Sequence, residues 1–253
     1  MKKYVIANWK MYLDPRQSVQ ITQSILSFLK NHTDSFSKLI ICPSFISLQE
    51  IGGIIGLGRS NKIQLGGQDV FWQENGAYTG EISAKMLRNT RCRYVIIGHS
   101  ERRSLGETDQ MIQKKMQAAW KARLIPILCV GESFEAYQKK QSFTVIKREL
   151  TSALAFIPKG SKCMIAYEPI WAISSQKQAS IDDIYITSQM QQIRTWLEDS
   201  YKGDNISFKL IYGGSVDASN INIFLNNPII DGVLIGSAST RFSSLKQILQ
   251  KIA

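Results

Sequence analysis

The sequence is poor in the residues that build metal sites and disulfide frameworks. It has only two histidines, His32 and His99, and four widely spaced cysteines with no CxxC or other zinc-like spacing. We therefore expect neither a metal site nor a disulfide-stapled fold. Isolated thiols are typical of the reducing cytosol, so we expect a cytoplasmic protein.

Long apolar stretches are also missing. No run approaches the length that spans a bilayer, and too few apolar residues follow Lys2 and Lys3 for a secretory signal. Hydrophobic residues still make up 44% of the 253 positions and charged residues 20%. These are ordinary globular proportions, so we expect a folded chain and exclude a disordered one.

Basic residues are in excess, yet no long basic run exists. The chain has 31 lysines and arginines against 20 aspartates and glutamates, a formal net charge of +11. They occur singly or in diluted pairs such as Lys114-Lys115, with no interleaved aromatic residues. We therefore expect solvated helix faces, with no nucleic-acid or membrane partner; a positive field could still steer a small anionic substrate.

Eight short apolar runs recur along the chain. Each is too short for a helix, and most are continuously apolar, which is typical of parallel strands covered by helices. The expected strands are Tyr4–Ala7, Leu39–Cys42, Ile63–Leu65, Tyr94–Ile97, Ile125–Val130, Met164–Tyr167, Phe208–Tyr212 and Val233–Ile235.

Amphipathic segments lie between many of these runs. Asp14-Pro15 is a typical helix start, and Ser180 with Asp183 resembles a capping box. Strands alternating with helices over this length predict an α/β chain, a single (β/α)8 barrel domain over residues 1–253.

A doubly wound open sheet is the alternative fold. Against it, no G-x-G-x-x-G motif follows the first strand. The glycines Gly52, Gly53, Gly56 and Gly58 do not directly follow a strand, and we expect them to mark a frayed helix end or a loop.

Polar residues follow several of the expected strands, where barrel enzymes place their chemistry. Lys10 follows the first strand, His99 the fourth and Glu168 the sixth. A carboxylate base, an imidazole and a fixed cation are the groups that a proton transfer needs. Taken singly, Glu168 could form a salt bridge, His99 could be a buried structural histidine and Lys10 could be a surface charge. Their common position on one rim favours catalysis. Glycine-bearing turns after the last two strands can hold an anion.

Seven motifs at these positions make the chain resemble the triosephosphate isomerase family along nearly its whole length. They stand in the family's order and at its spacing. The matching segments are Ala7–Met11, Gly76–Glu81, Gly98–Arg103, Cys129–Glu132, Ala166–Ala172, Tyr212–Val216 and Asp231–Gly236.

The resemblance implies a cofactor-free interconversion of dihydroxyacetone phosphate and glyceraldehyde 3-phosphate, two small phosphorylated trioses. It implies that Glu168 is the base, that a neutral His99 polarises the substrate oxygens, and that Lys10 supplies fixed positive charge. The substrate-binding residues that it implies are Asn8, Lys10, Ser174, Ser215, Gly236 and Ser237.

Further roles follow from the same resemblance. Pro169-Ile170-Trp171 matches the first hinge of a lid that Tyr212 and Ser215 grip when it closes. Glu101, Arg102 and Cys129 are expected to support the catalytic groups. The loop Gln68–Glu81, with Thr79, matches the one that enters a neighbouring subunit, which implies a homodimer; Phe71 and Trp72 suit a buried contact there.

Three positions depart from the family pattern. Ser174 and Gln176 in the lid, and Ser237 after the last strand, stand where the family usually has glycine. We expect phosphate binding to survive with altered lid motion or affinity, because glycine's conformational freedom is lost there.

Two other functions stay open. Lys10 could form a Schiff base with a sugar phosphate, as in barrel aldolases. A binding or scaffold protein could also have kept the motifs without turnover, although all three expected catalytic side chains are present.

Overall fold

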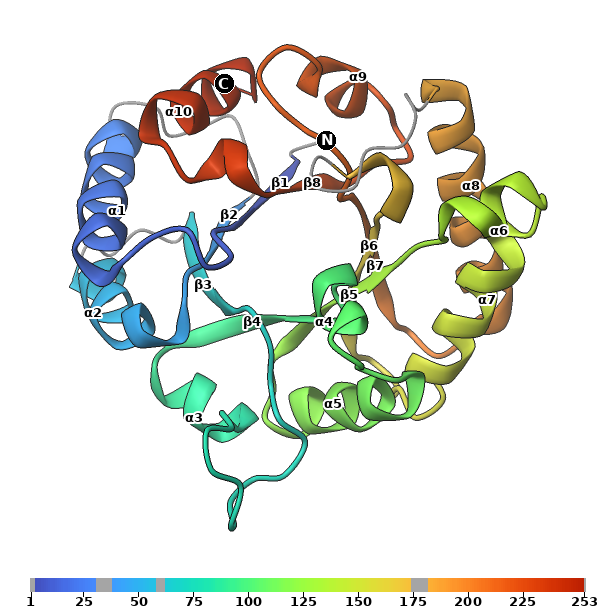
Figure 1. Cartoon of the computed structure of the whole chain (residues 1–253), viewed down its shortest axis with the longest axis horizontal. Helices are drawn as coiled ribbons and strands as arrows, with labels where there is room; N and C mark the ends of the chain where they lie inside the picture. Colours follow the sequence, from blue (N-terminus) through green and yellow to red (C-terminus); the bar gives the residue numbers. More distant parts are fainter. Residues whose placement is uncertain (1–2, 31–37, 58–61, 174–181, 253) are drawn as a thin grey trace.

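The computed structural model describes residues 3–30, 38–57, 62–173 and 182–252. Eight parallel strands close into one barrel in chain order, with β8 pairing back onto β1 (Figure 1). They are β1 Tyr4–Asn8, β2 Lys38–Cys42, β3 Ile63–Gly67, β4 Cys92–Ile97, β5 Ile125–Val130, β6 Lys162–Tyr167, β7 Ser207–Tyr212 and β8 Gly232–Ile235.

The predicted (β/α)8 barrel is confirmed, and each predicted strand is present. The observed ends differ by no more than two residues, because ladder pairing includes polar and glycine residues that flank the apolar runs. Lys38 pairs with Tyr4, for example, and Gly66 pairs with Tyr94.

Helices surround the barrel and cover its outer face (Figure 1). The α-helices are α1 Pro15–Lys30, α2 Leu48–Leu57, α3 Ala84–Asn89, α4 Ser100–Ser104, α5 Asp109–Lys121, α6 Phe134–Gln138, α7 Ser142–Ala153, α8 Asp183–Ser200, α9 Ile221–Leu225 and α10 Phe242–Ile252. Short 3-10 turns are η1 Phe45–Ser47, η2 Ile170–Ala172 and η3 Ser237–Ser239.

Two helix starts test the predicted capping. At α1 the prediction is confirmed: the Gln17 N–H donates to Asp14 Oδ1 at 2.8 Å, and the Asp14 N–H donates to Gln17 Oε1 at 3.1 Å. At α8 it is wrong. Asp182 is the N-cap and accepts from the Ile184 N–H, so Asp183 is the first helical residue, while Ser180 lies outside the described residues.

Gly52 and Gly53 lie in the middle of α2, so the expectation of a frayed end or loop is wrong for them, whereas Gly56 lies next to the last residue of the helix. Gly58 lies outside the described residues. The helix needs Gly52 because it passes close to the turn after α3, where a Cβ would stand 2.4 Å from the Thr90 carbonyl oxygen.

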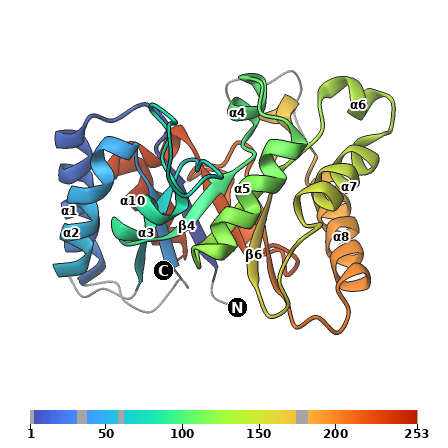
Figure 2. The same ribbon diagram turned by 90° about the horizontal axis from the view of Figure 1, so that it is seen from below.

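Apolar strand residues form two buried layers. Ile6, Ile96 and Ile211 belong to a cluster inside the barrel, whereas Val5 and Val95 belong to the larger cluster under the helices. Because both faces of each strand are packed, the strand ends form a rigid platform for side chains. Figure 2 shows α4 and α6 standing on the rim where the strands end.

Several absences hold for the described part of the chain. It contains no helix long and apolar enough to cross a membrane. It also contains no group of three or more histidine, cysteine or acidic residues placed to hold a metal ion. The four cysteines are buried and form no disulfide.

The two neighbouring glycines of α2 give a matched stability test. Gly52→Ala should destabilise the protein by about 2 kcal/mol, because its Cβ would overlap a backbone oxygen. Gly53→Ala should stabilise it by about 0.5–1 kcal/mol, because nothing lies within 4 Å of that Cβ and alanine favours a helix. Urea unfolding at fixed protein concentration measures both. If the two substitutions changed the free energy of unfolding by the same amount, the close approach of Gly52 to Thr90 would be contradicted.

Candidate active site

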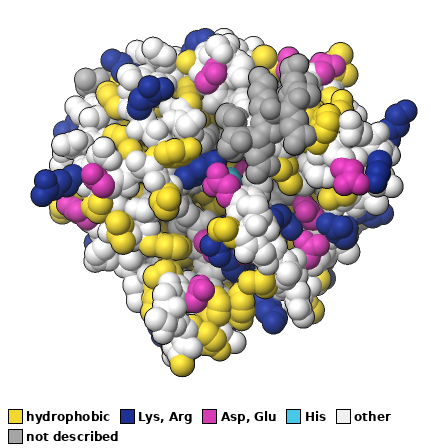
Figure 3. Space-filling view, viewed as in Figure 1, with side chains coloured by type: hydrophobic (Ala, Val, Ile, Leu, Met, Phe, Trp, Pro, Cys, Tyr) yellow, Lys and Arg dark blue, Asp and Glu magenta, His cyan; other side chains and the backbone are white. Residues whose placement is uncertain are grey.

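A cavity opens on the rim where the strands end. Figure 3 looks onto this face, where basic and acidic side chains meet near its centre. The cavity is lined by Asn8, Lys10, Tyr12, His99, Glu168, Ile173, Gly213, Gly214, Val216, Leu234, Gly236, Ser237 and Ala238.

Glu168 is the most deeply buried acid of this cavity, at 2% exposure. Its Oε1 accepts a hydrogen bond from Cys129 Sγ at 3.4 Å, while its Oε2 has no hydrogen-bond partner among the described residues. Desolvation raises the pKa of this carboxyl group, against the opposing effect of His99 and Lys10. A Cβ on Gly213 would stand 2.5 Å from Glu168 Cγ, so glycine makes room for the side chain.

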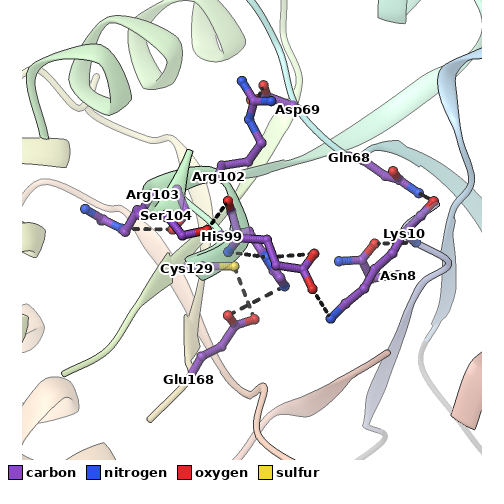
Figure 4. A network of polar contacts seen from close by, with 12 residues as sticks. Asn8, Lys10, Gln68, Asp69, His99, Arg102, Arg103, Ser104, Cys129 and Glu168 are labelled. Carbon is purple, nitrogen blue, oxygen red and sulfur yellow. Dashed lines mark hydrogen bonds and ion pairs between the residues drawn. The ribbon is translucent and has the colours of Figure 1, made fainter. Parts of the chain in front are cut away.

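His99 faces this carboxylate with one defined ring nitrogen. It is the N-cap of α4, and its Nδ1 accepts a hydrogen bond from the Glu101 N–H at 3.2 Å. Because Nδ1 accepts, the ring proton lies on Nε2. Nε2 is 3.8 Å from Glu168 Oε2, so a neutral imidazole directs its donor into the cavity (Figure 4).

Lys10 is held in a left-handed backbone conformation, with φ +47°. Its N–H donates to Asn8 Oδ1 at 3.1 Å, and its carbonyl accepts from Gln68 Nε2 at 2.8 Å (Figure 4). Gln68 also donates to the Cys42 carbonyl at 2.9 Å, which joins the loops after β1, β2 and β3. These bonds offset a backbone strain of about 1 kcal/mol and fix the position of the ammonium group.

Glu101 forms an ion pair with this ammonium group. Its Oε1 lies 2.7 Å from Lys10 Nζ, and its Oε2 lies 3.7 Å from His99 Nδ1. Arg102 instead pairs with Asp69 at 3.0 Å, outside the cavity. Asp69 in turn accepts from the buried Lys115 at 2.6 Å.

Sequence reasoning missed this second ion-pair network behind the site. Lys115 is 2% exposed and also contacts Glu107. No local pattern links Lys115 to Asp69, because the two residues lie 46 positions apart in the chain.

The turns after β7 and β8 form the opposite wall. Ser215 Oγ donates to the Ala172 carbonyl at 2.9 Å, which ties the β7 turn to the end of η2. A Cβ on Gly214 would overlap the Tyr212 hydroxyl, at 2.2 Å. Gly236 precedes η3, which begins at Ser237, and a Cβ on Gly236 would stand 3.5 Å from Lys10 Cε.

Glu132 anchors the predicted hinge, a role that the motif alone did not reveal. It is fully buried, and its Oε1 accepts from Trp171 Nε1 at 3.0 Å and from the Tyr185 and Tyr167 hydroxyls at 2.9 and 3.2 Å. Burial raises the pKa of its carboxyl group. The Tyr137 ring stacks on Trp171 with centroids 4.3 Å apart, so the Trp171 side chain is held from both sides.

The structure gathers most of the predicted site residues in one place. Asn8, Lys10, His99, Glu168, Gly236 and Ser237 line the same cavity. Ser215 lies beside it and lines a neighbouring hollow that shares Ser237. Ser174 and Gln176 lie outside the described residues.

A buried carboxylate, a neutral imidazole and a fixed ammonium group at the end of a (β/α)8 barrel define an enzyme site suited to proton transfer. The triosephosphate isomerase family model matches residues 3–252. The chain belongs to the triosephosphate isomerase family.

Individual relatives agree over almost the full length. Triosephosphate isomerase of Thermoanaerobacter sp. (strain X514) is 37% identical over 98% of this chain and 99% of its own. That of Dictyoglomus thermophilum is also 37% identical with the same coverage. The solved triosephosphate isomerase of Bartonella henselae has a TM-score of 0.83 and 29% identity, covering 99% of this chain and 98% of its own.

Glu149 ties α7 to the loops behind the cavity. Its Oε2 accepts from the Gly131 N–H at 3.1 Å, and its Oε1 lies 3.4 Å from Arg103 Nη1. Desolvation raises the pKa of Glu149 to about 7, although Arg103 and the Gly131 hydrogen bond oppose the shift.

This shift predicts a pH-dependent stability. Because the folded-state pKa of Glu149 is raised, its contribution is fully present below the unfolded pKa and is lost as pH rises through about 7. Stability should fall by up to about 3 kcal/mol between about pH 5 and pH 8 from this group. Glu149→Gln should remove that part of the decline in urea unfolding. Glu135→Gln, at an exposed position, is the control. If the fall in unfolding free energy with pH were unchanged in Glu149→Gln, Glu149 would not be its cause.

Proposed function

We propose that this chain interconverts dihydroxyacetone phosphate and glyceraldehyde 3-phosphate without a metal or cofactor. The observation that carries the proposal is the buried Glu168 carboxylate, 3.8 Å from the donor nitrogen of His99 and in the same cavity as Lys10. This family is itself a familiar example of a glutamate base paired with a neutral histidine.

Glu168 is the proposed base. Its carboxylate removes a proton from the carbon beside the carbonyl group, and the electron pair of that C–H bond forms the carbon–carbon double bond of an enediolate. Returning the proton to the neighbouring carbon, while the hydroxyl proton passes from one substrate oxygen to the other, completes the isomerisation. Desolvation makes the carboxylate a stronger base than it would be in water, because water no longer stabilises its charge.

His99 and Lys10 are proposed to stabilise the negative charge that forms on the substrate oxygens. The Nε2–H of His99 donates to them, and the ammonium group of Lys10 attracts both the enediolate and the phosphate. Asn8 supports this role by accepting from the backbone of Lys10. On binding, an anionic substrate would compete with Glu101 for Lys10.

The phosphate is proposed to lie at the turns after β7 and β8. Ser215 and Ser237 offer hydroxyl and backbone donors there, and glycine at 236 brings the backbone close to Lys10. Ser174 joins this set through the family resemblance alone.

The Schiff-base alternative is disfavoured by the state of Lys10. Its Nζ lies 2.7 Å from a carboxylate oxygen of Glu101 and is engaged in that ion pair, whereas a nucleophilic amine must be free to attack a carbonyl carbon. Borohydride with substrate should therefore trap no adduct.

Glu168→Gln tests the proposed base directly. Purified protein with EDTA should convert glyceraldehyde 3-phosphate rapidly, and Glu168→Gln should lower kcat by about 10²–10⁴-fold, since the amide cannot accept the proton. Glu198→Gln, at an exposed position of α8, should leave kcat unchanged. Wild-type protein that binds the triose phosphates without turnover would indicate the binding-only alternative.

We also propose that two copies of the chain associate through the Gln68–Glu81 loop. The loop projects beyond the ring of helices (Figure 1), and the rings of Phe71, Trp72 and Tyr78 pack together at its base. Large exposed apolar side chains accompany it on the loops after β1 and β2 and on the loop itself: Met11, Tyr12, Phe45, Ile46 and Tyr78. A second copy would bury these side chains and place Thr79 near its Lys10. The buried free thiols support a cytoplasmic location.

A matched pair of substitutions tests the dimer. Ile46 and Ile184 are both 76% exposed, but only Ile46 lies among the proposed interface residues. Ile46→Arg should shift the protein from dimer toward monomer in light scattering, because a charge would be buried at the interface. Ile184→Arg should leave the mass unchanged. A wild-type monomer at micromolar concentration would refute the dimer.

A further inference from the structure

The barrel end opposite the active site collects basic side chains. Seven of the eight strands have a lysine or arginine at their first position or within two residues of it; β8 instead follows Asp231. We call this end the strand-start face and define it by Lys3, Lys38, Lys62, Arg91, Arg93, Arg123, Lys162 and Lys209. Because the strands are parallel, residues far apart in sequence meet on one rim.

Several of these charges are not neutralised by neighbours. Arg93, Arg123 and Lys162 are exposed, and none pairs with a carboxylate among the described residues. Asp231 on the same rim is already shared between Arg194 at 2.9 Å and Lys209 at 3.1 Å.

Helix ends add to the same positive face. Lysine or arginine stands in the last turn of α1, α3, α5 and α10, whose C-terminal ends lie at this end of the barrel. The helix dipole favours basic residues at helix C-termini, and this explains the lysines and arginines in the last turns of these four helices. The dipole does not explain Lys38, Arg93 and Lys162, which lie within strands.

Two of the arginines occupy positions that favour glycine. Arg91 has φ +71° and Arg123 has φ +58°, the left-handed conformation in which glycine usually ends a helix. Arginine at each position costs about 1 kcal/mol of backbone strain relative to glycine. Each arginine lies just before the first residue of a strand. Two strained backbone positions on the strand-start face therefore carry a positive charge.

Exposed apolar side chains lie at the same end. Leu57, the last residue of α2, is 86% exposed, and Phe156, between α7 and β6, is 61% exposed. Basic residues spread around a rim together with exposed leucine and phenylalanine match the surface of an anionic bilayer, which is broad, negative and apolar just below its headgroups.

We propose that the strand-start face docks the protein on an anionic lipid surface. A duplex nucleic acid would contact a stripe, whereas these charges come from seven of the eight strands, and a planar surface can meet the exposed ones together: Arg91, Arg93, Arg123 and Lys162. Docked in this way, the active-site cavity on the opposite rim faces the water. This proposal departs from the expectation of no membrane partner, which rested on the lack of a basic run in the sequence.

Vesicle sedimentation tests the proposal with the full chain. Wild-type protein should sediment with phosphatidylcholine vesicles that contain phosphatidylserine, should not sediment with phosphatidylcholine alone, and should dissociate as salt rises. A triple variant, Arg93→Gln, Arg123→Gly and Lys162→Gln, should bind about 100-fold more weakly, since each basic residue contributes about fivefold. Arg123→Gly relieves strain, so weaker binding would not reflect unfolding.

The control variant changes charge equally elsewhere. Lys139→Gln, Lys140→Gly and Lys147→Gln also remove three exposed charges, and Lys140 has φ +56°, which matches Arg123. This control should bind vesicles like wild type, and both triple variants should keep full isomerase activity. Equal losses in the two variants, no binding to phosphatidylserine vesicles, or tighter binding to duplex DNA or RNA at the same salt would each overturn the proposal.

Discussion

Glu168 carries a carboxylate that is only 2% exposed, and much of the catalytic rim is arranged around that burial. Gly213 leaves space for the side chain, and Cys129 donates a hydrogen bond to it. His99 presents a neutral donor because the Glu101 N–H occupies its other ring nitrogen. A buried charge without a full set of partners is costly in the resting protein, and the same desolvation makes it an effective base.

Charged side chains are arranged differently at the two ends of the barrel. At the catalytic rim charged side chains are paired with one another: Lys10 lies 2.7 Å from Glu101, and Arg102 lies 3.0 Å from Asp69. At the strand-start face Arg93, Arg123 and Lys162 are exposed and without carboxylate partners in the described part of the chain.

The strands and the main catalytic cluster were predictable because each depends on a short, local sequence pattern. The apolar runs predicted the strands. Lys10, His99 and Glu168 follow three of these runs, and this predicted that they lie on a common rim. Long-range contacts were not predictable: no local pattern shows that Thr90 forces glycine at position 52, or that Lys115 meets Asp69. The basic face was hidden for the same reason, since only barrel closure gathers residues that the sequence keeps apart.

The central claim is that Glu168 moves a proton between adjacent carbons through an enediolate. The most direct measurement is proton NMR of the reaction of dihydroxyacetone phosphate in D₂O with the wild-type protein. A base that exchanges its proton with solvent while the enediolate exists should introduce deuterium at the carbon beside the carbonyl group, in both substrate and product. Isomerisation with no deuterium incorporated, together with unchanged turnover in Glu168→Gln, would indicate direct hydride transfer and would contradict the account.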